Sequence, residues 1–120
     1  MCQVVLVVIM SQLPIEIDVQ SVKQLLDGQE DFLLLDCREQ SERDFVHIEG
    51  SKHIPMGDTP ARVSELEPYL QKQIVVHCHH GGRSLQVTHW LREQGFENAQ
   101  NMTGGIDVWS VEIDPSRPRY

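Results

Sequence analysis

The sequence predicts an α/β domain with a mainly parallel sheet of about five strands and helices on both faces of that sheet. Short apolar runs alternate along the chain with segments of helical periodicity. The runs at residues 32–35 and 74–76 are continuously apolar, which is typical of strands buried on both faces of a parallel sheet. The linking segments have the length and pattern of helices, as crossover connections between parallel strands require.

Each expected element has its own start or stop signal. Asp18 is a helix N-cap for residues 19–27, and Gly28 stops that helix. Thr59 and Pro60 follow the N-cap and first-turn preferences and start a helix that runs through residue 70. The clearest amphipathic helix is 84–94, with Gly95 after its end. The expected strands are 15–18, 32–35, 52–54, 73–77 and 99–102; the remaining expected helices are 39–45 and 105–110.

Composition limits the size and class of the protein. The 120 residues are 40% apolar, which is enough for one domain with its own core. The formal net charge is −8 and only three lysines are present, so neither nucleic acid nor an anionic membrane is an expected partner. The three cysteines, Cys2, Cys37 and Cys78, form no CxxC pair, so we expect free thiols and a cytoplasmic location.

We expect residues 13–112 to form the domain, with an extension at 1–12 and a tail at 113–120. The apolar run at 4–10 is too short to span a bilayer and lacks the flanks of a signal peptide. It is either an edge strand or a stretch upstream of a true start at Met10, and the pattern favours the second. The tail contains Pro115 and Pro118 and is expected to fray.

The segment between strand 73–77 and the next helix carries the chemistry. Ligand sites of open parallel sheets lie beyond the carboxyl ends of the strands, and Cys78 is the first residue there. Free N–H groups at the following helix N-terminus favour an anion, and Gly81 and Gly82 let the chain turn with those groups pointing inward. Arg83 adds a permanent cation. These features favour a thiolate at Cys78.

The length of this loop separates two kinds of chemistry. Cysteine phosphatases place five residues between the cysteine and the arginine, whereas four separate Cys78 from Arg83, and Ser84 stands at the phosphatase arginine position. The shorter loop suits a transferred sulfur better than a phosphoryl group. A phosphatase or arsenate reductase is therefore disfavoured.

Three motifs together resemble the rhodanese family in its single-domain form, of the thiosulfate sulfurtransferase type. The loop is similar to that family's Cys-x-x-Gly-x-Arg signature. Residues 35–39, 47–51 and 54–55 are similar to its Asp-x-Arg and Gly-His-Ile-Pro-Gly-Ala stretch, and 101–109 to its closing Gly-Gly-x-x-x-Trp motif. Val46, Glu49 and Ser51 depart from the usual Gly, Pro and Ala, and His79-His80 is a less common loop filling.

The resemblance implies that Cys78 attacks the outer sulfur of a donor such as thiosulfate and forms a persulfide. Cyanide, a thiol or a protein cysteine then accepts the sulfur, without a cofactor or a metal. The residues implied to bind the anion are His79, His80, Gly81, Gly82, Arg83 and Ser84. The residues implied to be structural are Asp36, Arg38, His47, Gly104, Gly105 and Trp109.

Two questions stay open on the sequence alone. The same loop serves either a turnover enzyme or a persulfide carrier that supplies a partner protein. Cys37 follows the second buried strand and either resolves a Cys78 disulfide or packs as a core thiol, and the second interpretation is favoured.

Overall fold

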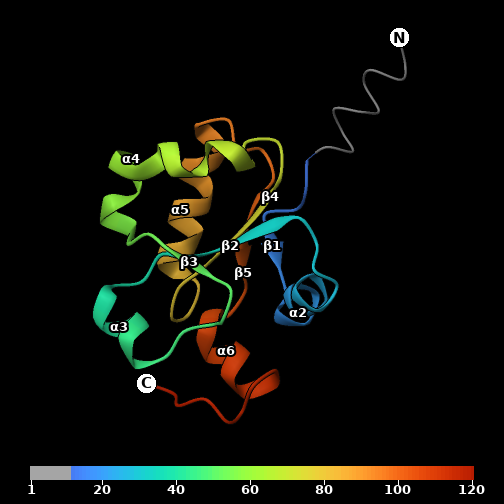
Figure 1. The fold of residues 1–120 in the computed structure, drawn as a ribbon, viewed down its shortest axis with the longest axis vertical. Coiled ribbons are helices and arrows are strands. Elements are labelled where there is room, and N and C mark those ends of the chain that lie inside the picture. The colour runs from blue at the N-terminus through green and yellow to red at the C-terminus, as the bar shows by residue number, and fades with distance from the viewer. Residues whose placement is uncertain (1–11) are drawn as a thin grey trace.

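The computed structural model describes residues 12–120, which form an α/β domain around one sheet (Figure 1). The strands run parallel in the order β1-β5-β4-β2-β3. Their bounds are β1 Glu16–Ile17, β2 Phe32–Asp36, β3 Lys52–His53, β4 Gln73–His77 and β5 Ala99–Met102. The predicted fold class and all five predicted strands are therefore confirmed. The alternatives for the amino-terminal extension concern residues outside the described ones.

Helices cover both faces of the sheet (Figure 1). The α-helices are α2 Val19–Asp27, α3 Gln40–Phe45, α4 Thr59–Arg62, α5 Gly82–Glu93 and α6 Gly105–Glu112, and the 3₁₀ segments are η1 Met56–Asp58 and η2 Val63–Tyr69. Successive β2 side chains alternate between two apolar clusters: Leu33 and Leu35 pack with η2 and α5, and Leu34 packs with α2 and α6. The core is thus split by the sheet into two layers.

Two helices differ from their predicted bounds. The expected helix at 59–70 divides at Arg62 into α4 and the 3₁₀ segment η2, which contains Pro68. Proline lacks a backbone N–H and clashes with the carbonyl four residues before it, so a continuous α-helix cannot pass through this position. Helix α5 begins at Gly82, two residues before the predicted Ser84, because Gly81 takes a left-handed N-cap conformation with φ +111°.

The tail at 113–120 is not frayed, contrary to the prediction. Arg117 donates to the Asp114 carboxylate at 2.8 Å and to the His47 carbonyl oxygen at 3.3 Å. Arg119 binds Asp107 with both guanidinium branches, and the Tyr120 ring stacks on His79. Charged and aromatic side chains hold this segment against the domain although its prolines prevent a helix. Across residues 12–120, no helix has the length and apolar character needed to span a membrane.

Candidate active site

The site lies where two neighbouring parallel strands end. Asp36, the last residue of β2, pairs with His77, the last residue of β4. Cys37 and Cys78 follow directly, and the Cys37 N–H donates to the His77 carbonyl oxygen at 3.1 Å. The predicted position of Cys78, on the first residue beyond the strand, is thus the observed one. Register places the second cysteine beside it.

The Cys78 sulfur accepts three hydrogen bonds from the loop that follows it. The Gly81 N–H lies 3.1 Å from Sγ, the Ser84 N–H lies 3.4 Å from it, and the Ser84 hydroxyl oxygen lies 3.2 Å from it. These donors belong to the turn into α5 and to its first turn, where backbone N–H groups lack partners within the helix. Gly81 and Ser84 are therefore the loop residues that donate to the sulfur.

Hydrogen bonding makes Cys78 an acidic thiol in spite of its burial. The Cys37 thiol contributes most to lowering the pKa of Cys78, burial opposes it, and donors on Ser84 and Gly81 add to the lowering, which brings the pKa to about 4. In return, the hydrogen bond with Cys78 raises the pKa of Cys37. Cys78 is only 1% exposed. What distinguishes it from an inert core thiol is therefore its set of donors, which stabilises the thiolate.

A polar side chain from β5 contacts the same loop. Asn101 Oδ1 lies 2.5 Å from the Ser84 hydroxyl oxygen, and Asn101 Nδ2 donates to the Gly81 carbonyl oxygen at 3.2 Å. Nδ2 also donates to the Glu16 carboxylate. Ser84 has one hydroxyl proton, so it serves either Asn101 or the Cys78 sulfur at a given moment. Asn101 thereby fixes the loop and the serine from the neighbouring strand.

The cation expected from Arg83 is already paired. Its guanidinium binds the Glu42 carboxylate of α3 through both branches, at 2.7 and 2.9 Å. Arg83 in turn holds the pKa of Glu42 at about 2. Arg83 thus links α3 to α5. Because the Glu42 carboxylate compensates its charge, Arg83 contributes little net positive charge near the Cys78 sulfur.

Three histidines of the loop differ in their surroundings. His77 is fully buried, neither ring nitrogen has a hydrogen-bond partner, and burial lowers its pKa. The His79 ring stacks between His80 and Tyr120, with ring centroids 3.9 Å apart on each side. The Tyr120 hydroxyl donates to Glu42 and accepts from Arg38, each at 2.8 Å. The tail thus forms part of the wall around the loop.

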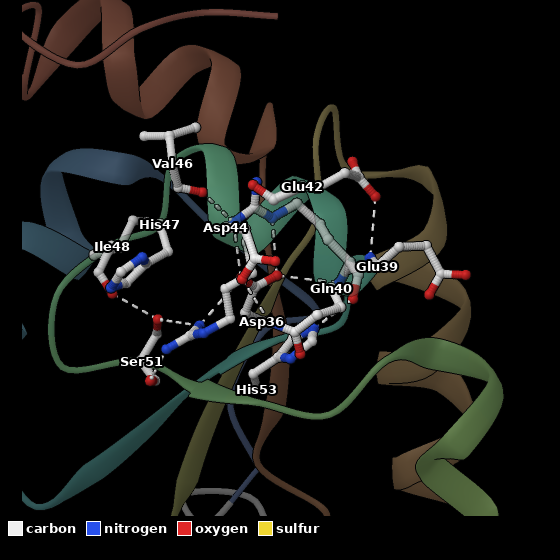
Figure 2. A network of polar contacts seen from close by, with 12 residues as sticks. Asp36, Glu39, Gln40, Glu42, Asp44, Val46, His47, Ile48, Ser51 and His53 are labelled. Carbon is white, nitrogen blue, oxygen red and sulfur yellow. Dashed lines mark hydrogen bonds and ion pairs between the residues drawn. The ribbon is translucent and has the colours of Figure 1, made fainter.

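The predicted structural residues Asp36 and Arg38 form a buried ion pair at the end of β2. The Arg38 Nε and Nη2 donate to the two Asp36 oxygens at 2.9 and 2.8 Å, and Nη2 also donates to the Val46 carbonyl at 2.7 Å. Figure 2 shows Asp36 at the centre of this network, with Val46 and Ser51 around it. Burial raises the pKa of Asp36, but Arg38 outweighs it and brings the pKa to about 2. The network fixes the turn that carries Cys37.

The closing glycine motif packs against the loop that follows β4. Gly105 has φ +61°, and a Cβ there would lie 2.5 Å from the His79 carbonyl oxygen and 2.6 Å from that of Cys78. The Ile106 N–H donates to the Cys78 carbonyl oxygen at 2.9 Å, and the Asp107 N–H donates to the His79 carbonyl oxygen at 3.1 Å. Trp109 is buried on the same helix, in the layer opposite Cys78. His47 is exposed, and only its backbone carbonyl contributes a contact, to Arg117.

Within the described part of the chain, no group of three or more His, Cys, Asp or Glu side chains is arranged to hold a metal ion. The residues at the sheet edge instead surround one sulfur atom with donors. This arrangement can stabilise a thiolate, or a negative charge on a sulfur bound to Cys78.

Known proteins give the arrangement a family. A family model described as Rhodanese-like domain matches residues 18–112. The chain belongs to the rhodanese-like family. It is 35% identical over 100 residues to "Putative sulfurtransferase YtwF" of Bacillus subtilis, covering 83% of this chain and 94% of that protein. It is 35% identical over 99 residues to "Putative sulfur carrier protein YrkF" of the same organism, covering 82% and 52% respectively.

The solved structures support the same fold. "Human Single Domain Sulfurtransferase TSTD1" superimposes with a TM-score of 0.74 at 22% identity, covering 83% of this chain and 98% of that one. The rhodanese-like chain spans about half the length, or less, of several curated relatives that it matches. Sulfur transfer is the general chemistry that the named relatives support.

Sequence reasoning missed three residues that shape the site: Glu42, Asn101 and Tyr120. Asn101 had a usable signal, because it lies near the carboxyl end of the strand beside β4. Glu42 and Tyr120 are 41 and 78 residues away in sequence from the groups they bind in the site, Arg83 and Glu42. Nothing local in the sequence marks those contacts.

Proposed function

We propose that the protein transfers a sulfane sulfur from thiosulfate or a similar donor to a thiophilic acceptor through a Cys78 persulfide. The observation that carries this proposal is the set of hydrogen bonds that Gly81 and Ser84 donate to the Cys78 sulfur. Together with Cys37 they lower the pKa of Cys78 to about 4. At neutral pH this thiol is ionised, so it needs no separate base to act as a nucleophile.

The first half-reaction loads the enzyme. The Cys78 thiolate attacks the outer sulfur of thiosulfate, the sulfur–sulfur bond of the donor breaks, and sulfite leaves with the electron pair. The product is a persulfide on Cys78. The hydrogen bonds that Gly81 and Ser84 already donate to the Cys78 sulfur support this step, because the persulfide charge would lie next to them.

The second half-reaction regenerates the thiolate. An acceptor such as cyanide, a thiol or a protein cysteine attacks the outer sulfur, and the electron pair of the broken bond returns to Cys78. Two half-reactions through one covalent intermediate predict ping-pong kinetics.

The pairing of Arg83 with Glu42 favours a second candidate function, a persulfide carrier for a partner protein. A dianionic small donor gains little from a cation that a carboxylate already compensates. In that case the persulfide forms, but turnover with free thiosulfate and cyanide is slow.

The test combines intact mass with turnover. Incubation with thiosulfate is expected to add about 32 Da, one sulfur atom on the nucleophile, and cyanide is then expected to remove it as thiocyanate. Cys78→Ser should gain no mass and form no thiocyanate, whereas the matched Cys2→Ser variant should behave as the unchanged protein. A Cys78→Ser variant with full activity would refute the proposal. A stable mass gain with slow thiocyanate release would instead identify a carrier.

A further inference from the structure

Two cysteines stand side by side at the carboxyl edge of the sheet. The pairing of Asp36 with His77 places Cys37 opposite Cys78 on adjacent strands, and the Cys37 N–H continues the ladder by donating to His77. Both side chains belong to the same apolar cluster, so they project toward the same face of the sheet. Each is 1% exposed.

The spacing of adjacent strands is compatible with the Cα separation of a disulfide. Neighbouring strands lie about 4.7–4.9 Å apart, and disulfides join residues whose Cα atoms are about 4.4–6.8 Å apart. The Cys37 thiol also acts on the Cys78 sulfur directly, as the main group that stabilises its thiolate. The register and the strand spacing are therefore compatible with a bond between the two sulfur atoms.

We propose that Cys37 is a resolving cysteine that attacks the Cys78 persulfide, releases hydrosulfide and leaves a Cys37–Cys78 disulfide. This inference rests on the proposed function, because the persulfide is its substrate. It adds a second fate for the loaded enzyme, in which sulfur leaves as sulfide when no acceptor takes it.

The step balances without an external oxidant. The Cys37 proton passes to the outer sulfur, the Cys37 sulfur forms a bond to Cys78 Sγ, and the bond between Sγ and the outer sulfur breaks. Hydrosulfide leaves with that electron pair. The outer sulfur is reduced to sulfide and the two cysteines are oxidised to the disulfide. A small thiol or a dithiol protein then reduces the disulfide and restores both cysteines.

The surroundings of Cys37 suit a slow second step. The Cys78 thiolate raises the pKa of Cys37, so the resting pair consists of one thiolate and one thiol. A persulfide moves the negative charge one sulfur further from Cys37. Resolution is expected to compete with transfer only when acceptor is scarce, because burial keeps Cys37 largely protonated.

The experiment follows the loaded protein after removal of excess thiosulfate and without acceptor. The unchanged protein is expected to gain about 32 Da, then lose that mass and finish about 2 Da lighter than the reduced protein, with one equivalent of sulfide released. Cys37→Ser keeps a hydroxyl donor beside Cys78 but cannot form the disulfide. Its persulfide should persist about tenfold longer, with no 2 Da loss. Cys2→Ser is the matched control and should follow the unchanged protein.

Two further measurements separate the possible failures. Non-reducing peptide mapping must find Cys37 joined to Cys78, and a thiol oxidant such as diamide must produce the same bond without thiosulfate. A persulfide that decays equally in Cys37→Ser, or a bond that involves Cys2, would overturn the inference while leaving the proposed function intact. If neither the unchanged protein nor Cys37→Ser gains about 32 Da from thiosulfate or polysulfide, both proposals fail.

Discussion

Two turns of this molecule occupy equivalent places and have opposite characters. The turn after β2 and the turn after β4 leave adjacent parallel strands, and each begins with a buried cysteine. After β2, Arg38 binds both oxygens of Asp36 and a main-chain carbonyl, so every charge has a partner. After β4, the N–H groups of Gly81 and Ser84 point at a sulfur atom.

We propose that this difference separates a scaffold from a reactive site. The paired charges of Asp36 and Arg38 in the first turn fix the backbone, and their hydrogen-bonding groups are used within the protein and not for a ligand. In the second turn, donors converge on one atom that can change its charge and its bonding, which is electrostatic preorganisation. Glu42 joins the two, since it accepts from the Glu39 N–H at the start of α3 and binds Arg83 of α5.

The largest expected effect comes from breaking the first turn. Arg38→Met removes the buried partner of Asp36, and both side chains of this pair are 0% exposed. Asp36 then keeps only Arg43, whose Nη1 lies 3.2 Å from Oδ2. Breaking a buried ion pair costs about 3–5 kcal/mol, and because Arg43 remains we expect a loss at the lower end of that range in the free energy of unfolding, measured by urea denaturation. Lys23→Ala breaks the exposed pair with Asp27 and should cost no more than about 0.5 kcal/mol. Equal losses in the two variants would contradict the assignment of the first turn as scaffold.

The next effect tests the support of the second turn. In Gly105→Ala a Cβ would lie 2.5 Å from the His79 carbonyl oxygen, at a backbone conformation with φ +61°. We expect a loss of about 1–3 kcal/mol in unfolding free energy, because left-handed backbone strains an alanine. Displacement of the loop should also reduce persulfide formation by about 10²-fold, measured by intact mass.

Gly57→Ala is the matched control for this substitution. A Cβ at Gly57 would meet nothing within 4 Å. Its stability and its rate of persulfide formation should therefore stay near those of the unchanged protein. If Gly105→Ala were equally harmless, the closing motif would not be what positions Cys78.

The fold of the turn after β4 was predictable from the sequence because its signals are local. A buried strand, a cysteine, two glycines and a helix follow one another from residue 73 to 94, and the physics of a helix N-terminus needs no distant partner. The division of the 59–70 helix was also visible, since Pro68 stands inside it. The prediction of one helix rests on the favourable start at Thr59-Pro60 and neglects the proline that breaks an α-helix.

The long-range contacts were not predictable in this way. The sequence predicts Arg83 as an unpaired cation because its partner Glu42 lies on another helix. The charge of a side chain does not indicate where its counter-ion lies. The sequence predicts a frayed tail because its prolines exclude a helix. The tail is nevertheless held in place, since the Tyr120 ring stacks on His79 and Arg119 forms an ion pair with Asp107. Helix-breaking residues predict the absence of a helix, which is a weaker statement than disorder.

The smallest expected effect concerns a single donor of the second turn. Ser84→Ala removes the hydroxyl that lies 3.2 Å from the Cys78 sulfur but keeps the backbone N–H. Cys78 has a lowered pKa of about 4, so its thiolate is present above that pH and is lost as the pH falls through it. A hydrogen bond to a charged group contributes about 1.5–3 kcal/mol, so the midpoint of persulfide formation against pH should rise by about one to two pH units.

Single-turnover rates and the ultraviolet absorbance of the thiolate both measure that midpoint. Since the thiolate would still predominate at neutral pH, the rate there should change little, whereas the rate near pH 4 should fall about 5- to 50-fold. Ser84→Thr keeps a hydroxyl and should retain most of the low midpoint if the larger side chain is tolerated. A midpoint unchanged in Ser84→Ala would mean that the Ser84 hydroxyl donates to Asn101 Oδ1, 2.5 Å away, and not to the sulfur, so that backbone N–H groups and Cys37 alone stabilise the thiolate.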